Sequence, residues 1–209
     1  MRAIALVAIV GAGMTLGGVA AAEPWTDPAG RVSFETPSGW RVQPQIATGQ
    51  TVVLAFNAGN DCYFFGLSNP LTTTATARSA RNSTMPLTPE AWASIGAPIR
   101  DFFPDGAAQL VSQSVDTSHF WPSQRAELGG GSRPVFGAVA LRPGFEMRAL
   151  CSGSSSAAAY ESIFASLGHP NDSRWQAEAE QQEAERAAAA AAAAAPPEEE
   201  QSGRRRRNN

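Results

Sequence analysis

Apolar and polar residues alternate along much of this chain, with a repeat of two residues. Val52, Leu54 and Phe56 lie on one face of the segment 51–57, as they would in a strand whose successive side chains point to opposite sides. The same alternation predicts strands at 32–35, 40–43, 51–57, 62–67, 108–117, 124–128, 133–141 and 145–151. Tight turns, such as the glycines at 129–131, join neighbouring strands, which must therefore run antiparallel.

A first helix is predicted after Thr88, whose side chain can cap the helix start, with Pro89 in the favoured first position. Its apolar residues repeat at helical spacing and are Trp92, Ile95 and Ile99. Because proline has no amide hydrogen and clashes with the preceding turn, Pro98 should end or kink this helix.

A second helix is predicted from four apolar residues that share one helical face, Tyr160, Ile163, Phe164 and Leu167. The serines at 154–156 supply caps, and Gly168 and Pro170 mark its end. Residues 69–86 are rich in Ser, Thr and Ala and indicate a long surface loop or a weak helix. Together these elements predict an α+β fold, an antiparallel sheet with helices packed on it.

The first 22 residues have the order of an export signal. Arg2 precedes a short apolar run, and small residues with A-x-A spacing end at Ala22, just before Glu23. The run is shorter than the roughly 20 apolar residues that span a bilayer. We therefore expect cleavage after Ala22 and a periplasmic or secreted protein; the alternative is an anchor that is not cleaved.

The composition excludes some classes of function. The formal net charge is −3, so no overall positive field favours nucleic-acid binding. All 16 basic residues are arginine, which excludes catalysis by a lysine amine. The abundance of arginine and alanine is typical of a GC-rich bacterial genome.

The chain has two cysteines, Cys62 and Cys151. In an exported protein, an even number of cysteines indicates a disulfide. The alternative is a pair of buried free thiols.

The composition changes near residue 170, which predicts a single domain at 23–170 followed by a tail at 171–209. A helix is expected at 174–195, with Trp175 as its only large apolar residue. Because it has no apolar stripe to pack, this helix should be solvated and partly formed.

Two blocks of opposite charge follow this helix and are typical of a disordered end. The acidic block is Glu198–Glu200, and the basic block consists of Arg204, Arg205, Arg206 and Arg207. The tail is either an extension without a partner or a spacer that presents these arginines to an anionic surface.

Two segments resemble a known family. The opening 25–40, with its glycine before a short strand and its Pro-x-Gly-Trp turn, and the closing helix at 160–167 resemble PsbP-like and DcrB-like proteins. This resemblance implies an α/β/α sandwich around an antiparallel sheet, and a binding or accessory role rather than an enzyme. No ligand residues of the family can be placed on this chain.

No catalytic signature accompanies these elements. The sequence contains no G-x-S-x-G elbow, no glycine pattern for phosphates and no ligand spacing for a metal, so neither a metal nor a cofactor is predicted. His119, Phe120 and Trp121 combine a polar group with two aromatic rings and form the candidate binding site. The alternative is that the two rings only fill the core. His169 is expected to meet carbonyls at a helix end.

These observations predict a bacterial envelope protein that acts as a non-catalytic binding or accessory module for an envelope protein or a small ligand. One alternative is an envelope hydrolase with a site near His119. The other is a protein that binds anionic surfaces through the arginines of its tail.

Overall fold

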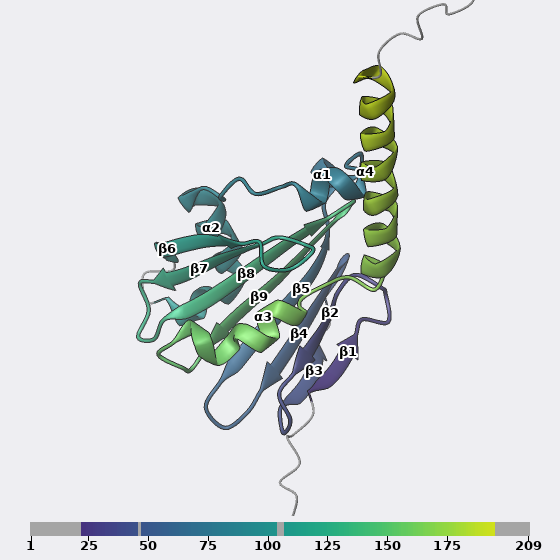
Figure 1. Ribbon diagram of the computed structural model, residues 1–209. Helices are drawn as coiled ribbons and strands as arrows, with labels where there is room; N and C mark the ends of the chain where they lie inside the picture. The colour runs from purple at the N-terminus through teal and green to yellow at the C-terminus, as the bar shows by residue number, and fades with distance from the viewer. Residues whose placement is uncertain (1–21, 46, 104–106, 195–209) are drawn as a thin grey trace, which may run out of the picture.

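A seven-stranded antiparallel sheet forms the centre of the computed structural model, which describes residues 22–45, 47–103 and 107–194 (Figure 1). Its order across the sheet is β3 (Arg41–Gln45), β4 (Gln50–Phe56), β5 (Asp61–Ser68), β9 (Phe145–Ser152), β8 (Val135–Arg142), β7 (Ser123–Gly129) and β6 (Gln109–Asp116). The predicted α+β fold is confirmed.

Some of the predicted segments lie outside the described residues. They are most of the leader and both charge blocks of the tail, so the basic block of Arg204, Arg205, Arg206 and Arg207 falls beyond the last described residue, Ala194. The surface-binding role considered for these four arginines stays a prediction.

A separate two-stranded sheet pairs β1 (Glu23–Thr26) with β2 (Ser33–Thr36). The strands predicted at 32–35 and 40–43 follow each other in the sequence but do not pair, because β2 pairs with β1 and β3 pairs with β4. β1 is only four residues long and contains Pro24, so it carries no alternation from which a strand could be predicted. Pro44 lies in β3, at the edge of the large sheet, where a missing amide hydrogen is tolerated.

One face of the large sheet is covered by α2 (Pro89–Gly96), which continues as the 3-10 helix η2 (Ala97–Phe102). The predicted cap is present, since the Thr88 side chain accepts a hydrogen bond from the amide of Ala91 at 3.2 Å. The change from α to 3-10 geometry directly before Pro98 confirms the predicted kink. Trp92 is fully buried here, and its Nε1 donates to Gln113 Oε1 at 3.0 Å.

The opposite face is covered by β1, β2 and the helix pair η3 (Ala157–Tyr160) and α3 (Glu161–Ser166). Phe34 of β2 stacks on Phe64 of β5, with ring centroids 3.6 Å apart. Because both faces are covered, β8 is buried along nearly its whole length, as expected of a strand packed on both sides.

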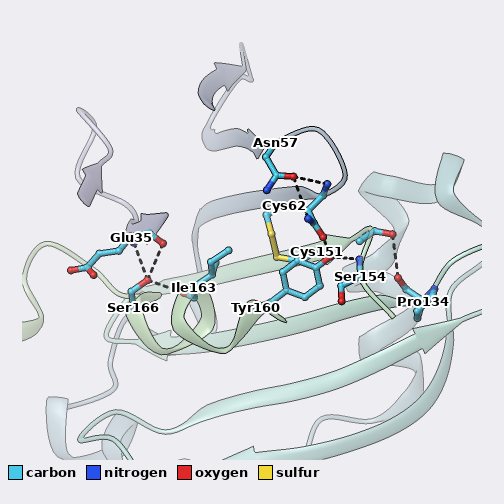
Figure 2. Close-up of a disulfide and its surroundings, with 11 residues drawn as sticks. Glu35, Asn57, Cys62, Pro134, Cys151, Ser154, Tyr160, Ile163 and Ser166 are labelled. Atoms are coloured by element: carbon cyan, nitrogen blue, oxygen red, sulfur yellow. Dashed lines mark hydrogen bonds between the residues drawn. A yellow bond between two sulfur atoms is a disulfide. The ribbon is translucent and has the colours of Figure 1, made fainter. Parts of the chain in front are cut away.

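The predicted disulfide is confirmed between Cys62 of β5 and Cys151 of β9, which are directly opposite in the strand register. Both cysteines are fully buried in the core under α3. Figure 2 shows the bridge beside Tyr160, whose hydroxyl accepts a hydrogen bond from the Ser154 amide at 2.7 Å and donates to Asn60 Oδ1 at 2.8 Å. The bridge thus joins two central strands that lie far apart in the sequence.

The segment 69–86 contains the short helices η1 (Pro70–Thr72) and α1 (Ala77–Arg81), joined by loops, so it combines the two forms that were predicted. The C-terminal helix α4 (Asp172–Ala194) lies beside α1, and its later turns extend beyond the sheet (Figure 1). No helix within the described ranges is long and apolar enough to cross a membrane.

The expectation that the C-terminal helix has nothing to pack against was wrong for its first turns. Trp175 and Ala179 of α4 are buried against Ala77 of α1. Tryptophan and alanine four residues apart lie on the same face of a helix, and the small alanines let the two helix backbones approach. The side chains from Ala184 to Ala194 are exposed, as predicted for this alanine-rich segment.

Candidate functional site

The predicted site residues lie in the loop between β6 and β7. His119 is exposed, whereas Phe120 and Trp121 are half-buried. The two rings meet edge to face, with centroids 5.0 Å apart, and they also pack against the cluster around Trp175. The two rings therefore contribute to a hydrophobic cluster and also line a cavity, and their role in ligand binding stays a prediction.

This cavity has a volume of about 220 Å³ and lies where the loop, the sheet and the ends of two helices meet. The loop contributes the three predicted residues, β7 contributes Ser123 and Arg125, and β8 contributes Ala140 and Arg142. The remaining wall is formed by the end of α3 and the start of α4, through Phe164, Ala165, Ser166, Leu167, Gly168 and Asp172.

Two arginines hold the aromatic rings of the loop. The Arg81 guanidinium lies 4.4 Å from the ring centroid of Phe120, and the Arg142 guanidinium lies 4.5 Å from that of Trp121. Cations at this distance are attracted to aromatic faces. The loop is therefore fixed from two directions, by α1 and by the end of β8.

Both arginines pair with acidic residues of α4. Arg81 Nη1 lies 2.7 Å from Glu183 Oε2, with both side chains partly exposed. Arg142 is 2% exposed, and its Nε and Nη2 donate to the two carboxylate oxygens of Asp172 at 2.7 and 2.9 Å. Its Nη1 donates to the carbonyl of Leu141 at 2.9 Å. Because each guanidinium nitrogen of Arg142 has an acceptor, this residue serves to support the loop.

Arg125 has a different environment. Its Nη2 lies 3.1 Å from Asp116 Oδ2 and 3.6 Å from Glu161 Oε1, and its guanidinium lies 5.0 Å from the ring centroid of Phe164. Its Nε and Nη1 are buried and have no hydrogen-bond acceptor among the described residues. The Nε1 of Trp121, in the same cavity wall, is also a buried donor without a described acceptor.

The acidic partner of Arg125 stays ionised. Burial alone would raise the pKa of Asp116, but hydrogen bonds from Ser118 and Arg125, and the charge of Arg125, lower it to about 2. The side chain of Ser118 and its backbone amide both donate to Asp116 Oδ1, at 2.6 and 2.9 Å. Asp116 therefore holds two parts of the site in place, the start of the aromatic loop and the side chain of Arg125.

His169 does not meet helix-terminal carbonyls, so that expectation was wrong. It is 3% exposed and lies between the rings of Phe145 and Trp175, at centroid distances of 4.4 and 4.6 Å. Its Nδ1 accepts a hydrogen bond from the amide of Asn171 at 3.0 Å. Burial lowers the pKa of His169 to about 4, with Asp172 opposing this shift and Arg142 and Arg174 adding to it.

The sequence pattern did not identify Arg125 or Arg142. Arg125 lies on the polar side of an alternating strand, which indicates a solvent-facing position, but α3 covers that side of β7. Arg142 lies beside a turn at the end of β8, where a charged residue is normally exposed. The sequence did contain a signal for Asp172, the partner of Arg142. It is a short acidic residue at a helix start, and such residues favour helix N-termini.

Within the parts of the chain that the structure describes, no hydrogen bond joins His119 to a serine or to an acid that would orient it. The described residues contain no group of three side chains that could hold a metal ion. The wall of the cavity combines aromatic rings with polar and charged side chains.

Neither a family model nor a curated protein matches the chain. Among solved structures, it is similar to the solution structure of cyanobacterial PsbP (CyanoP) from Synechocystis sp. PCC 6803, with a TM-score of 0.49 and 13% sequence identity. The match covers 77% of this chain and 98% of that one. That protein bears the name of the family that segments 25–40 and 160–167 resemble, and the likeness assigns no ligand or activity to this chain.

Proposed function

We propose that this chain is an exported, non-catalytic module that binds a small ligand in the cavity behind the His119–Trp121 loop. The observation that carries the proposal is the cavity itself, whose wall combines the rings of Phe120, Trp121 and Phe164 with polar side chains such as His119 and Ser123. Binding pockets typically combine apolar walls with a few placed polar groups of this kind.

Export is supported by the leader pattern and by the disulfide. Disulfides form and persist in oxidising compartments and are rare in the reducing cytosol. Expression of the full chain in a bacterial host, followed by fractionation and intact-mass measurement, tests this part. We expect residues 23–209 in the periplasm or the medium; a full-length chain in the cytoplasm would contradict export.

Ligand binding is tested with two variants of α3. Ala165 lines the cavity from an exposed position, so Ala165→Trp should block the cavity without disturbing the core. Ser162 is exposed on the same helix and does not line the cavity, so Ser162→Trp is the matched control. In a fragment screen by saturation-transfer NMR, fragments should bind the unmodified protein and Ser162→Trp but not Ala165→Trp. If no fragment distinguishes Ala165→Trp from the control, the cavity is not a ligand site.

The hydrolase alternative is tested on the same protein. Panels of ester, peptide and glycoside substrates should show no turnover, because His119 lacks a described partner that would activate it. Turnover that disappears in His119→Ala would replace the binding proposal with an enzymatic one.

A further inference from the structure

The strand β6 forms an open edge of the large sheet (Figure 1). It pairs with β7 on one side, and no other described residue forms a backbone hydrogen bond with it. Because a strand in an antiparallel sheet directs alternate amides and carbonyls to each side, one row of these groups along β6 has no described partner. Another extended chain can pair with such a row.

The two edges of the sheet differ in how well they are protected. Proline, basic residues, bulges and short strands normally block pairing at an edge. β3, at the other edge, is five residues long and contains Pro44. β6 is eight residues long and has neither proline nor a basic residue, and its acidic residue, Asp116, accepts from Arg125. A bulge between Leu110 and Ser112 interrupts its start, so the regular open run extends from Ser112 to Asp116.

A groove of about 300 Å³ lies beside this run. On β6 it is lined by the small, exposed side chains of Ser112 and Ser114. Further in, Phe136, Ala157 and Phe164 provide apolar surface. Because the side chains of a strand alternate between the two faces of a sheet, every second side chain of a strand added to β6 would lie on the face of these serines. The serines are small enough for a long side chain to pass over them into the groove.

The charges in the groove favour a basic side chain. Its arginine, Arg125, already lies 3.1 Å from Asp116, which compensates its charge. Glu127 is half-buried and forms no ion pair with a described residue, and the side chain of Glu161 is 60% exposed, with Oε1 3.6 Å from Arg125 Nη2. Both glutamates line the groove. They therefore present two accessible carboxylates beside apolar surface, which suits a cation on an apolar stem.

We infer that the β6 edge binds an extended segment of a partner protein in which every second residue is arginine or lysine. The main chain of the segment pairs with 112–116, and its basic side chains cross the serines to reach Glu127 and Glu161. A second copy of this chain does not supply such a segment through β6, which has no basic residue. The inference names a protein partner, so it goes beyond the small ligand of the proposed function and does not depend on it.

The test uses the mature chain, residues 23–209, labelled with ¹⁵N, and a seven-residue peptide of alternating arginine and valine with blocked ends. At saturating peptide, hydrogen exchange of alternate amides in 112–116 should slow at least about tenfold, because these amides gain acceptors. A peptide with glutamine in place of arginine should bind at least about fivefold more weakly by calorimetry. Equal binding of the two peptides would overturn the assignment of a basic segment.

Two methylated peptides distinguish strand addition from a loose electrostatic contact. A strand added to an edge uses only alternate amides of its own backbone. The arginine peptide is therefore methylated either on its odd-numbered or on its even-numbered amides. One version should bind at least about tenfold more weakly than the other, because it loses the pairing hydrogen bonds. Equal binding of the two versions, or unchanged exchange in 112–116, would overturn strand addition.

A double variant of the protein tests the two carboxylates. Glu127→Gln/Glu161→Gln should weaken binding of the arginine peptide at least about fivefold. Glu35→Gln/Glu178→Gln is the matched control, because it removes the same charge from two exposed positions outside the groove, and it should change binding less than about twofold. Equal weakening by the two double variants would show that only the overall charge matters and would overturn the groove assignment.

A second variant fills the groove from the protein itself. Ser112 is exposed and lies directly opposite Glu127 in the strand register, so Ser112→Arg places a cation where the partner's side chain would lie and should abolish binding. Ser38→Arg adds the same side chain at an exposed serine outside the groove and should leave binding unchanged. Peptide binding that survives Ser112→Arg would contradict the inference.

Sedimentation of the chain without peptide tests whether a second copy occupies the edge. We expect a monomer whose alternate amides in 112–116 exchange fast until peptide is added. A dimer that dissociates in Ser112→Arg, with these amides already protected, would assign the edge to a second copy and overturn the inference.

Discussion

Arg142 and Asp172 are joined by two parallel hydrogen bonds, from Nε to Oδ1 at 2.7 Å and from Nη2 to Oδ2 at 2.9 Å, which fasten the start of α4 to the end of β8. Asp172 Oδ2 also accepts from the amide of His169 at 3.2 Å. The same arginine lies against Trp121. One residue pair therefore connects the C-terminal helix, the sheet and the aromatic loop of the candidate site.

A second connection between α4 and the loop runs through Arg81, which pairs with Glu183 and lies against Phe120. The aromatic rings of Phe120 and Trp121 are in contact with each other. The helix thus supports the loop at two points, and the candidate site depends on residues on both sides of the predicted domain boundary at 170.

Asp172→Asn should destabilise the protein by about 3 kcal/mol. The substitution removes the charge that compensates the buried Arg142, and breaking one side of a buried ion pair is strongly destabilising. Urea unfolding of residues 23–209 measures the effect. Glu178→Gln is the control, because Glu178 pairs with Arg174 at 4.0 Å on an exposed helix surface, where such pairs contribute at most about 0.5 kcal/mol. Equal losses for the two variants would show that Arg142 does not depend on Asp172.

Removing the disulfide should cost about 4–5 kcal/mol. The bridge closes a loop between cysteines separated by 89 residues, and the chain-entropy model gives a stabilisation of this size for such a loop. Urea unfolding of Cys62→Ala/Cys151→Ala, compared with the oxidised protein, measures it. Non-reducing mass spectrometry should find the oxidised chain two hydrogens lighter than the reduced one. Alkylation of both thiols without prior reduction would contradict the bridge.

Much of the fold could be predicted because period-two alternation and proline and glycine positions are local signals. The strands near Val52 and Met147 and the kink at Pro98 follow from such signals. β1 could not be predicted, since it is a short edge element defined by its pairing with β2, which lies a turn away. Pairing across the sheet, such as β5 with β9, depends on contacts between residues far apart in the sequence, and the cysteine pair was its one sequence signal.

The site could be predicted only in part, for a related reason. Phe120 and Trp121 stand out because adjacent aromatic residues beside a histidine are rare in a polar loop. Arg125 and Arg142 look like ordinary surface arginines, and their burial follows from the positions of α3 and α4 above the sheet. A helix that covers a polar strand face leaves no mark in that strand's own sequence, so the cavity needed the three-dimensional structure.

Trp92→Ala should destabilise the protein by about 3–5 kcal/mol. Trp92 is fully buried between α2 and the sheet, and its removal leaves a large cavity and breaks the hydrogen bond to Gln113 Oε1. Leu71→Ala is the control, because Leu71 is 90% exposed and surface changes rarely exceed about 0.5 kcal/mol. Thermal and urea unfolding measure both variants. A loss below about 1 kcal/mol for Trp92→Ala would mean that α2 is not part of the core.

His169 should make the protein less stable as the pH falls from about 6.5 to 4. Its pKa is about 4 in the folded protein, lowered from 6.5 by burial, so between these values the unfolded chain binds a proton that the folded protein does not. Proton uptake by the unfolded state favours unfolding at lower pH, by up to about 3 kcal/mol over this range. The structure explains why folded His169 binds a proton weakly. Its Nδ1 already accepts a hydrogen bond from the Asn171 amide and would lose this bond on protonation.

Urea unfolding at intervals between about pH 7.5 and 4.5 measures this slope. His169→Gln should flatten it, and His119→Gln, which changes an exposed histidine, should leave it unchanged. Asp116 does not contribute in this range, because its pKa of about 2 in the folded protein, lowered from 3.8, confines its loss of stabilisation to pH values below about 4. A slope that persists in His169→Gln would place the proton uptake on another group and contradict the assignment to His169.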